Sequence, residues 1–488
     1  MNRSLVPLLL AWAACGRNTQ SNQIKVGSKE FTESVILGEI ATGVLEGTGQ
    51  TAVHLKGLGG SRVLWDALRS GQVDIYPEYT GTLAFELLPT ADYQAALERI
   101  GLRMLPSLGF NNTYALGLKR KLADTLGVST LSDLGHHPEL RLGLSNEFID
   151  RGDGWKTLRE RYHLPQKDVR GMEHELAYRA IESGAVDVID LYSTDGDARM
   201  HDLVILRDNL HHFPEYQAVY LYRSQLEQTA PLAIKALRSL SGHISDSEMI
   251  EMNAQAKFGK VPESEVAAKF FERQQIRSRT VHRESRWELF LTHTVDHLFL
   301  VGTSLLAAVV VAIPLGILSA KRRRLGQVVL ALTGLVQTIP SLALLVFMIP
   351  LLGIGARPAI AALFFYSLLP MVRNTHAGLT GIPVGILQSA QALGLPAWTR
   401  LWKVELPIAS PSILAGVKTS AVINVGTATL GALVGAGGYG QPILTGIRLD
   451  DLGLILQGAL PAAGLALLVQ GAFELLERAV VPLGLRLR

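Results

Sequence analysis

The hydrophobic pattern of this 488-residue chain changes between residues 286 and 298. After that point long apolar runs replace the mixed polar and apolar segments that come before. A helix needs about 20 predominantly apolar residues to cross a bilayer. The runs predict about five membrane spans, of which the third is short: 298–319, 325–352, 358–372, 413–436 and 453–475.

Before the change, residues 22–275 alternate short apolar strands with helical patterns, which is typical of layered α/β domains. Strands are expected at 24–28, 73–76, 141–144 and 186–189, and a helix at 33–45. The fold predicted for the chain is therefore an α/β domain over 22–275, a linker over 276–296 and an all-α polytopic membrane domain over 297–488.

The first 15 residues have the pattern of a signal peptide. Arg3 precedes an apolar run over 5–14, which is too short to span a bilayer, and Cys15 follows it. Ala13-Ala14-Cys15 resembles the end of a bacterial lipoprotein box, but Trp12 stands where that motif normally has Leu, so lipidation of Cys15 stays open. Because Cys15 is the single cysteine, an intrachain disulfide and a cysteine-based metal site are excluded.

Charge separates the chain into the same two parts. Residues 297–488 carry five acids against 13 Lys and Arg, a net charge of +8 within a chain of net +3. The basic part is also the apolar one, so its charges fit membrane orientation better than nucleic-acid binding. Four basic residues at 321–324 follow the first span and predict a cytoplasmic loop. We therefore expect a multi-pass protein of the bacterial inner membrane, with residues 22–296 outside the cytoplasm.

Alternation from that loop places the segment 373–412 and the C-terminal tail inside and the loop 437–452 outside. The inside segment is too long to be a simple turn. It contains Gln388-Ser389-Ala390, then Gly394, then Glu405-Leu406-Pro407. This pattern resembles the coupling-helix motif of ABC importer permeases, although Gln388 replaces the usual Glu. It implies a short helix, a turn at Gly394 and a second helix that ends before Pro407, together forming a knob that docks on a separate cytoplasmic ATPase.

Nothing in the sequence predicts catalysis by this chain. Gly435, Gly437 and Gly440 satisfy G-x-G-x-x-G, but they follow a membrane span rather than a buried strand, and the chain has no G-x-x-x-x-G-K-[ST] motif. We therefore expect a transporter subunit with no cofactor, served by a partner that hydrolyses ATP. His293 and His297 have helical spacing, but without H-E-x-x-H they do not predict a metal site. Since ABC machines need two permease halves, a homodimer in the membrane lipid is expected.

Several motifs narrow the family. They occur at 26–33 (VGSKEFTE), 74–82 (DIYPEYTGT), 111–114 (NNTY), 147–151 (EFIDR), 190–195 (DLYSTD) and 213–216 (FPEY), and in the membrane part at 338–344 (TIPSLAL) and 426–432 (GTATLGA). Together they resemble the osmoprotectant ABC importers, which move glycine betaine, choline and carnitine. The resemblance implies a bilobed, periplasmic-binding-protein-like receptor fused to its permease, with crossovers between the lobes near Asn112 and near 211–214.

A quaternary ammonium has no N–H to donate, so proteins bind it with the faces of aromatic rings. Ten of the twelve tyrosines lie between Tyr76 and Tyr222. The resemblance places four of them around the trimethylammonium group and three donors at the carboxylate of a zwitterionic ligand. Those cage residues are Tyr79, Tyr114, Tyr192 and Tyr216, and the donors are Lys29, Thr82 and Arg151. Asn112 stands where some betaine and choline binders carry an acid.

Other functions remain open at this stage. A related branch imports the trimethylated zwitterion ergothioneine with the same kind of cage. Ligand-gated channels and receptors also fuse bilobed sensors to membrane spans, but they need no cytoplasmic docking knob, so the segment 388–407 argues against them. A third possibility is an exported binding domain that the spans merely anchor.

Overall fold

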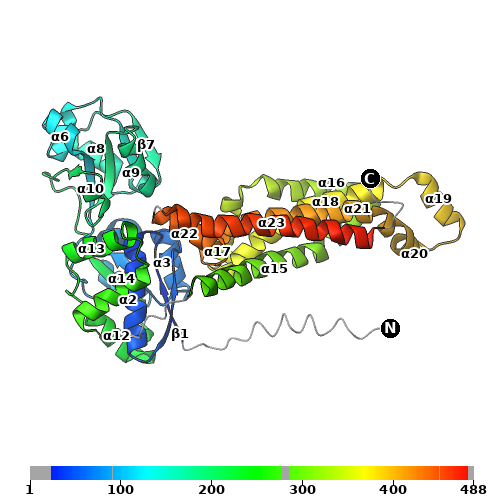
Figure 1. Cartoon of the computed structure of the whole chain (residues 1–488), viewed down its shortest axis with the longest axis horizontal. Coiled ribbons are helices and arrows are strands. Elements are labelled where there is room, and N and C mark those ends of the chain that lie inside the picture. The colour runs from blue at the N-terminus through cyan, green and yellow to red at the C-terminus, as the bar shows by residue number, and fades with distance from the viewer. Residues whose placement is uncertain (1–22, 91, 277–284, 450, 482–488) are drawn as a thin grey trace.

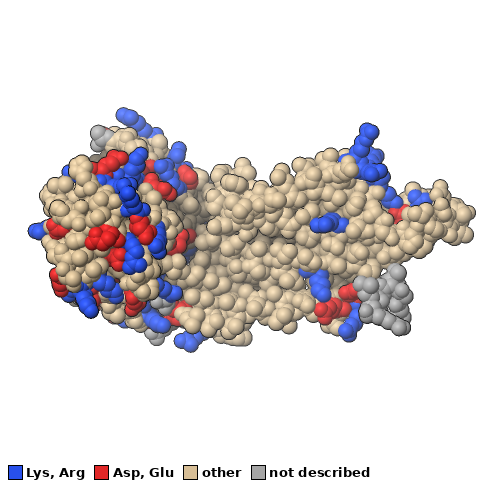
Figure 2. Space-filling view, turned by 90° about the horizontal axis from the view of Figure 1, so that it is seen from above, with Lys and Arg blue, Asp and Glu red and all other residues tan. Residues whose placement is uncertain are grey.

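The computed structural model describes residues 23–90, 92–276, 285–449 and 451–481. The predicted signal peptide, including Cys15, lies outside these residues. The chain forms an α/β part made of two lobes, set at one end of an elongated bundle of helices (Figure 1). Charged side chains cover the α/β part and reappear at the opposite end of the bundle, with an almost uncharged band between them (Figure 2).

The first lobe is built on a five-stranded sheet of order β2-β1-β3-β10-β4. Strand β1 pairs in parallel with β2 and β3, and β10 is antiparallel to β3 and β4. The strands are β1 (Gln23–Gly27), β2 (Thr51–Leu55), β3 (Ile75–Tyr79), β4 (Leu102–Met104) and β10 (Ala218–Arg223). The helices are α2 (Thr32–Gly47), α3 (Ser61–Arg69), α4 (Thr80–Thr82), η1 (Leu83–Leu87), α5 (Tyr93–Arg99), α11 (Leu226–Thr229), α12 (Pro231–Arg238), α13 (Asp246–Lys257) and α14 (Glu263–Gln274).

The second lobe repeats this plan with the order β7-β6-β8-β5-β9. Strand β6 is parallel to β7 and β8, while β5 is antiparallel to β8 and β9. The strands are β5 (Tyr114–Lys119), β6 (Leu142–Ser145), β7 (Val169–Met172), β8 (Val188–Tyr192) and β9 (Leu203–Ile205). The helices are α6 (Arg120–Leu126), η2 (Leu131–His136), α7 (Asn146–Asp150), α8 (Trp155–Tyr162), α9 (His174–Glu182) and α10 (Asp197–Met200).

The two connections between the lobes run side by side. Asn111 and Gln217 form an antiparallel bridge, and the backbone N–H of Asn112 donates to the carbonyl of Tyr216 at 3.0 Å. The expected strands at 73–76 and 186–189 are each found about two residues later, as β3 and β8. Because of this shift, the two strands end at Tyr79 and Tyr192, and both residues lie where the two lobes meet.

The helical part contains α15 (Arg286–Lys321), α16 (Arg323–Thr338), α17 (Ser341–Leu352), α18 (Ala356–Thr380), α21 (Leu406–Thr427), η4 (Ala428–Val434), α22 (Gly440–Arg448) and α23 (Leu452–Val480). Residues 286–296, expected as linker, are the first turns of α15, because Ser285 and Glu288 form a capping box that starts the helix there. Within the bundle, polar side chains bond across helices, as when Asn424 Nδ2 donates to Ser304 Oγ at 3.1 Å.

The spans differ in two ways from those expected. The run 325–352 is not one straight span but the pair α16 and α17, bent by 98°. The bend falls at Pro340, which cannot donate a helical hydrogen bond. By length and composition three of the described helices could cross a membrane, or four if the bent pair is one span. Helix α18, which holds the short expected span 358–372, is not among them.

The segment 384–405 forms the end of the bundle that lies away from the α/β part (Figure 1). It consists of α19 (Val384–Ala392), a turn in which Gly394 has φ +73°, α20 (Ala397–Arg400) and the π-helical η3 (Leu401–Glu405). The expectation that the second helix ends before Pro407 is wrong. Instead α20, η3 and α21 form one continuous helix, and Pro407 follows its π-helical turn η3 directly.

The first lobe rests on the neighbouring end of the bundle. Arg448 of α22 donates from Nη2 to Glu263 Oε1 of α14 at 2.6 Å, and both side chains are buried. Leu449 is part of the hydrophobic core of the first lobe. Gln72 accepts a hydrogen bond from the backbone N–H of Ile354, which packs against a second core of the same lobe. The receptor-like part and the bundle therefore share both polar and apolar contacts.

Candidate ligand-binding site

A cavity of ≈ 1190 Å³ lies between the two lobes and extends down to the helical bundle. From the bundle it is lined by parts of α17, η4 and α22, among them Leu345, Val434 and Gln441. All eight residues predicted to bind a ligand line this one cavity: Lys29, Tyr79, Thr82, Asn112, Tyr114, Arg151, Tyr192 and Tyr216. Positions up to 187 residues apart in the sequence are thus brought to a common surface.

Three of the four predicted cage tyrosines form one aromatic group. The ring of Tyr114 lies 4.9 Å from that of Tyr192 and 5.8 Å from that of Tyr216, centroid to centroid, the second pair edge to face. Tyr79 joins through Phe31, whose ring is 6.1 Å from Tyr79 and 5.8 Å from Tyr192. Phe31 thus connects the first lobe to the second, a role that sequence reasoning missed although the residue lies in the 26–33 motif.

Further rings support the cage from behind. Phe148 lies 5.1 Å from Tyr114, and Phe213 lies 6.5 Å from it. Gly81 is needed beneath Tyr216, because a Cβ at that position would lie 2.5 Å from Cε1 of the ring. Any residue other than glycine would push the ring from its place. Gly81, Phe148 and Phe213 all lie in the motifs on which the family resemblance is based. Their place in those motifs was the sequence signal that could have identified them.

The two predicted cationic donors are already paired with acids. Lys29 Nζ bonds Glu78 Oε1 at 2.5 Å, and both side chains are buried. Arg151 Nε donates to Asp153 Oδ1 at 2.9 Å, and Arg151 Nη1 donates to Glu86 Oε2 at 3.1 Å across the gap between the lobes. Both groups also lie over cage rings. Lys29 Nζ is 5.2 Å from the Tyr79 centroid, and Arg151 Cζ is 5.1 Å from that of Tyr114 and 5.6 Å from that of Tyr216.

The protein's own cations therefore occupy positions over the aromatic faces that a quaternary ammonium would use. Burial works against the charge of Arg151, but Tyr114, Asp153 and Glu147 together raise its pKa above the ordinary value, so it stays a cation. Burial likewise raises the pKa of Tyr79, Tyr114 and Tyr192 well above the usual range, which keeps these phenols neutral. The cage is thus a set of aromatic rings with two basic side chains placed over them.

Behind Tyr79 lies a buried carboxylate that the sequence analysis did not assign. Glu33 Oε1 accepts from Tyr79 Oη at 2.6 Å and from Asn112 Nδ2 at 2.8 Å. Its Oε2 accepts from Thr194 Oγ1 at 2.6 Å and from Asn253 Nδ2 at 3.0 Å. Burial raises the pKa of Glu33, while these four hydrogen bonds lower it in part. An acid among the buried residues at the start of α2 was the signal in the sequence.

On the second lobe, the ring of His174 packs against that of Tyr192, with centroids 4.5 Å apart, and lines the same cavity. Its Nε2 lies 3.0 Å from Asp195 Oδ2, and its Nδ1 is 3.9 Å from the buried Asp190. Burial opposes protonation, but Asp195 and Asp190 raise the pKa of His174 well above its ordinary value. The protonated form of His174 is therefore favoured beside this cage ring.

The predicted coupling residues lie at the opposite end of the molecule. Gln388, Ser389 and Ala390 belong to α19, Gly394 forms the turn, and Leu406 and Pro407 begin α21. Glu405 is buried, pairs with Lys321 of α15, and accepts from Arg400 Nε at 3.0 Å. Around the turn Leu393 is 80% exposed and Trp398 69% exposed. Such exposed apolar side chains favour a protein partner at this end, and sequence reasoning had not singled them out.

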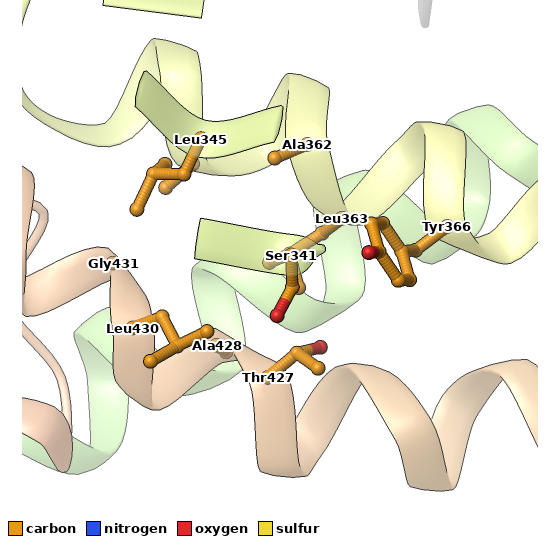
Figure 3. A pocket seen from close by; sticks show the side chains of 10 residues that line it. Ser341, Leu345, Ala362, Leu363, Tyr366, Thr427, Ala428, Leu430 and Gly431 are labelled. Carbon is orange, nitrogen blue, oxygen red and sulfur yellow. The ribbon is translucent and has the colours of Figure 1, made fainter. Parts of the chain in front are cut away.

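A second, much smaller hollow lies inside the bundle (Figure 3). Ser341, Tyr366 and Thr427 supply its polar atoms among apolar side chains, and its volume is ≈ 20 Å³. That is about the space of a single water molecule, so it cannot hold a trimethylammonium group. His297, which was not expected to bind a metal, bonds the carbonyl of Val425 from Nε2 at 3.0 Å. No group of three or more possible metal ligands occurs in the described parts of the chain.

Comparisons with known proteins agree with both parts. Residues 22–273 match the family described as the substrate binding domain of ABC-type glycine betaine transport systems, and residues 312–482 match the binding-protein-dependent transport system inner membrane component. The glycine betaine/carnitine/choline transport system permease protein OpuCB of Bacillus subtilis (strain 168) is 40% identical over 196 residues, which are 40% of this chain and 90% of the relative. The osmoprotectant import permease protein OsmW of Salmonella typhimurium is 39% identical over 198 residues, 40% of this chain and 92% of the relative. A solved structure of a glycine betaine/carnitine/choline ABC transporter is similar over 52% of this chain and 100% of its own, with 28% identity and a TM-score of 0.47.

Proposed function

Since this chain belongs to the ABC-type glycine betaine transport family, as a substrate-binding domain fused to an importer permease domain, we infer that it captures quaternary-ammonium compatible solutes for its own permease half. It is a transporter subunit of the inner membrane rather than an enzyme, and ATP hydrolysis belongs to a cytoplasmic ATPase partner. Glycine betaine, carnitine and choline are the proposed ligands, and residues 22–296 are proposed to lie outside the cytoplasm.

The observation that carries this proposal is the shared cavity. Four tyrosines, two cationic side chains and the hydroxyl of Thr82 line one space between the lobes. Aromatic faces attract a cation that cannot donate hydrogen bonds. Lys29 and Arg151 could exchange an acidic partner for the carboxylate of a zwitterion through charge-assisted bonds.

The course of the cavity supports direct transfer to the membrane path. It continues from the cage to the outer end of α17 and α22, and the Arg448–Glu263 bond holds the first lobe in that position. We propose that ligand released from the cage enters the permease between these helices. The break at Pro340 gives α17 a joint about which the outer end of the bent pair can move.

The end of the bundle away from the α/β part contains the proposed connection to the cytoplasmic ATPase. The knob formed by α19, α20 and η3 is tied to α15 through the pair of Glu405 with Lys321. Since α15 runs to the end of the bundle on which the first lobe rests, a movement of the knob can reach the outer end. We further propose a homodimer of permease halves in the membrane lipid, because one chain supplies one half.

The test combines binding with transport. Calorimetry on the full chain in lipid nanodiscs should detect glycine betaine, carnitine or choline, and Y114A and Y216A should each weaken binding. Uptake into vesicles should require the ATPase and ATP. Binding of ergothioneine alone would redirect the assignment to that ligand, whereas a ligand-evoked current without ATP would refute the importer. If no ligand binds and neither variant changes any affinity, the cage assignment is wrong.

A further inference from the structure

Glu33 is the buried acid of this domain that no basic group balances. Lys29 is paired with Glu78, and Arg151 is paired with Asp153, Glu86 and Glu147. No ion pair joins Glu33 to any side chain in the described parts of the chain, although it is only 2% exposed. A buried charge without a partner is costly, so its presence beside a site for a cation needs a reason.

The bonding pattern favours the ionised carboxylate. Four donors point at its two oxygens: the hydroxyls of Tyr79 and Thr194 and the side-chain amides of Asn112 and Asn253. An ionised carboxylate can only accept, and two bonds to each oxygen match that capacity. Burial raises the pKa of Glu33 and favours the neutral acid, whose proton a hydroxyl could accept. The four donors act against burial and stabilise the negative charge.

The position of Glu33 couples that charge to the cage. Tyr79 lines the cavity with its ring and donates its hydroxyl to Glu33, so the carboxylate increases the electron density of a ring that would face the ligand. Thr194 follows β8 of the second lobe, whereas Glu33 lies on α2 of the first. The same group thus also connects the two lobes behind the ligand.

We propose that Glu33 determines the specificity of the site for a permanent cation, because its carboxylate supplies the negative potential behind the cage, both directly and through the hydroxyl of Tyr79. This proposal rests on the proposed function. It assigns the preference for the charged nitrogen to a residue that does not itself line the cavity, whereas the shape of the site is set by the rings. Glu33 is thus a positioning and charge-supplying residue rather than a ligand contact.

The effect of charge can be separated from that of shape with pairs of ligands that have the same shape but differ in one positive charge. Glycine betaine and 3,3-dimethylbutanoate differ only in the quaternary nitrogen, which is a carbon atom in the second compound, and both keep the carboxylate. Choline and 3,3-dimethylbutan-1-ol form the same kind of pair without a carboxylate. For each pair, the ratio of the two affinities measures the contribution of the positive charge. Competition calorimetry on the full chain in nanodiscs gives this ratio for each variant.

E33Q should lower the ratio about tenfold in both pairs, while the uncharged 3,3-dimethylbutan-1-ol keeps its affinity within about twofold, since one buried charge is removed at nearly constant volume. Y79F should lower it about threefold, because the ring remains but its hydrogen bond to the carboxylate is lost. Y222F is the matched control. It removes the same atom from a tyrosine that does not line the cavity and whose hydroxyl donates to a different carboxylate, Glu227 Oε1, at 2.7 Å, so its ratio should stay that of the wild type.

The outcomes distinguish the proposal from its premise. If wild-type protein binds neither glycine betaine nor choline, the proposed function itself fails and the role of Glu33 fails with it. If it binds them but E33Q weakens the nitrogen ligand and the carbon analogue of each pair equally, Glu33 has only a structural role. Should E33Q not fold, the comparison of Y79F with Y222F decides, and equal ratios in these two variants overturn the proposal.

Discussion

Arg151 is expected to oppose one class of ligand and to assist another, and R151M should separate the two effects. Its guanidinium lies over the rings of Tyr114 and Tyr216, at 5.1 and 5.6 Å from their centroids. A cation that enters the cage must displace it from both. A zwitterion then offers its carboxylate to the displaced group, whereas tetramethylammonium offers nothing in return.

The magnitudes follow from these contacts. A cation–π contact contributes about 0.5–2 kcal/mol, depending on how far it is desolvated. Loss of the competing guanidinium should therefore strengthen tetramethylammonium binding by about 1–2 kcal/mol, roughly 5- to 30-fold. Glycine betaine gains the same term but loses a charge-assisted bond of about 1.5–3 kcal/mol. The ratio of the two affinities removes the shared term and should fall roughly 10- to 150-fold.

The assay is calorimetry of both ligands on the full chain in nanodiscs. Since R151M leaves the buried Asp153 without its partner, R151M/D153N is measured beside it to restore the balance of charge. R170M is the control, because Arg170 pairs with Asp168 at 2.9 Å on the exposed surface of the second lobe. If R151M weakens both ligands by the same factor, Arg151 does not compete for the cage and this interpretation is refuted.

Three further predictions concern other parts of the molecule. R448M should abolish most ATP-driven uptake without weakening ligand binding, because the buried Glu263 loses its partner at a cost of about 3–5 kcal/mol. The double variant E263Q/R448M should recover part of the uptake. Full uptake activity in R448M would contradict a docking role for this ion pair. The pKa of His174 is raised in the folded state, so its stabilising effect is complete below the ordinary pKa and is lost as the pH rises through the raised one. The thermal midpoint of the domain should therefore fall with rising pH above neutrality in the wild type and change less in H174Q, and equal slopes would exclude this pair as the cause. E405Q should leave ligand affinity unchanged but reduce ligand-stimulated ATPase activity, since it weakens the bonds to Lys321 and Arg400. S410A is the control, because it removes only a hydroxyl that is bonded to the carbonyl of Pro407.

Local pattern in the sequence predicted the elements of the fold but not the contacts between distant ones. Alternating hydrophobicity indicated the α/β layers, and the apolar runs indicated the bundle. The bond of Lys29 to Glu78 joins residues 49 positions apart, and the bonds of Glu33 reach over 161 and 220 positions. No periodicity carries such information, because it depends on how the two sheets are placed against each other. The motifs indicated the candidate site residues, and the folded chain shows which of these residues lie close together.

The same limit explains the two corrections in the bundle. Hydropathy treats 325–352 as one apolar run because it sums side chains and is insensitive to the backbone donor that Pro340 lacks. Conversely, Pro407 looks like a helix stop from its residue type alone. Its effect depends on the local hydrogen bonds, and here the π-helical turn η3 lies directly before Pro407 while the helix continues into α21. Proline thus bends one apolar run and lies inside a continuous helix in another.

Occupation of the cage by Lys29 and Arg151 also bears on transfer to the permease. When a ligand must displace groups of the protein itself, its apparent affinity falls by the fraction of molecules in which the cage is free. The displaced cations return to Glu78 and Asp153 as the ligand leaves, so no charge is left unpaired at release. Because the receptor is tethered to the permease that it serves, the effective concentration of its docking surface is high without a large interface. A moderate affinity of the receptor is therefore compatible with delivery of the ligand to the tethered permease. A receptor whose own cations did not compete for the cage would release its ligand more slowly into the same cavity.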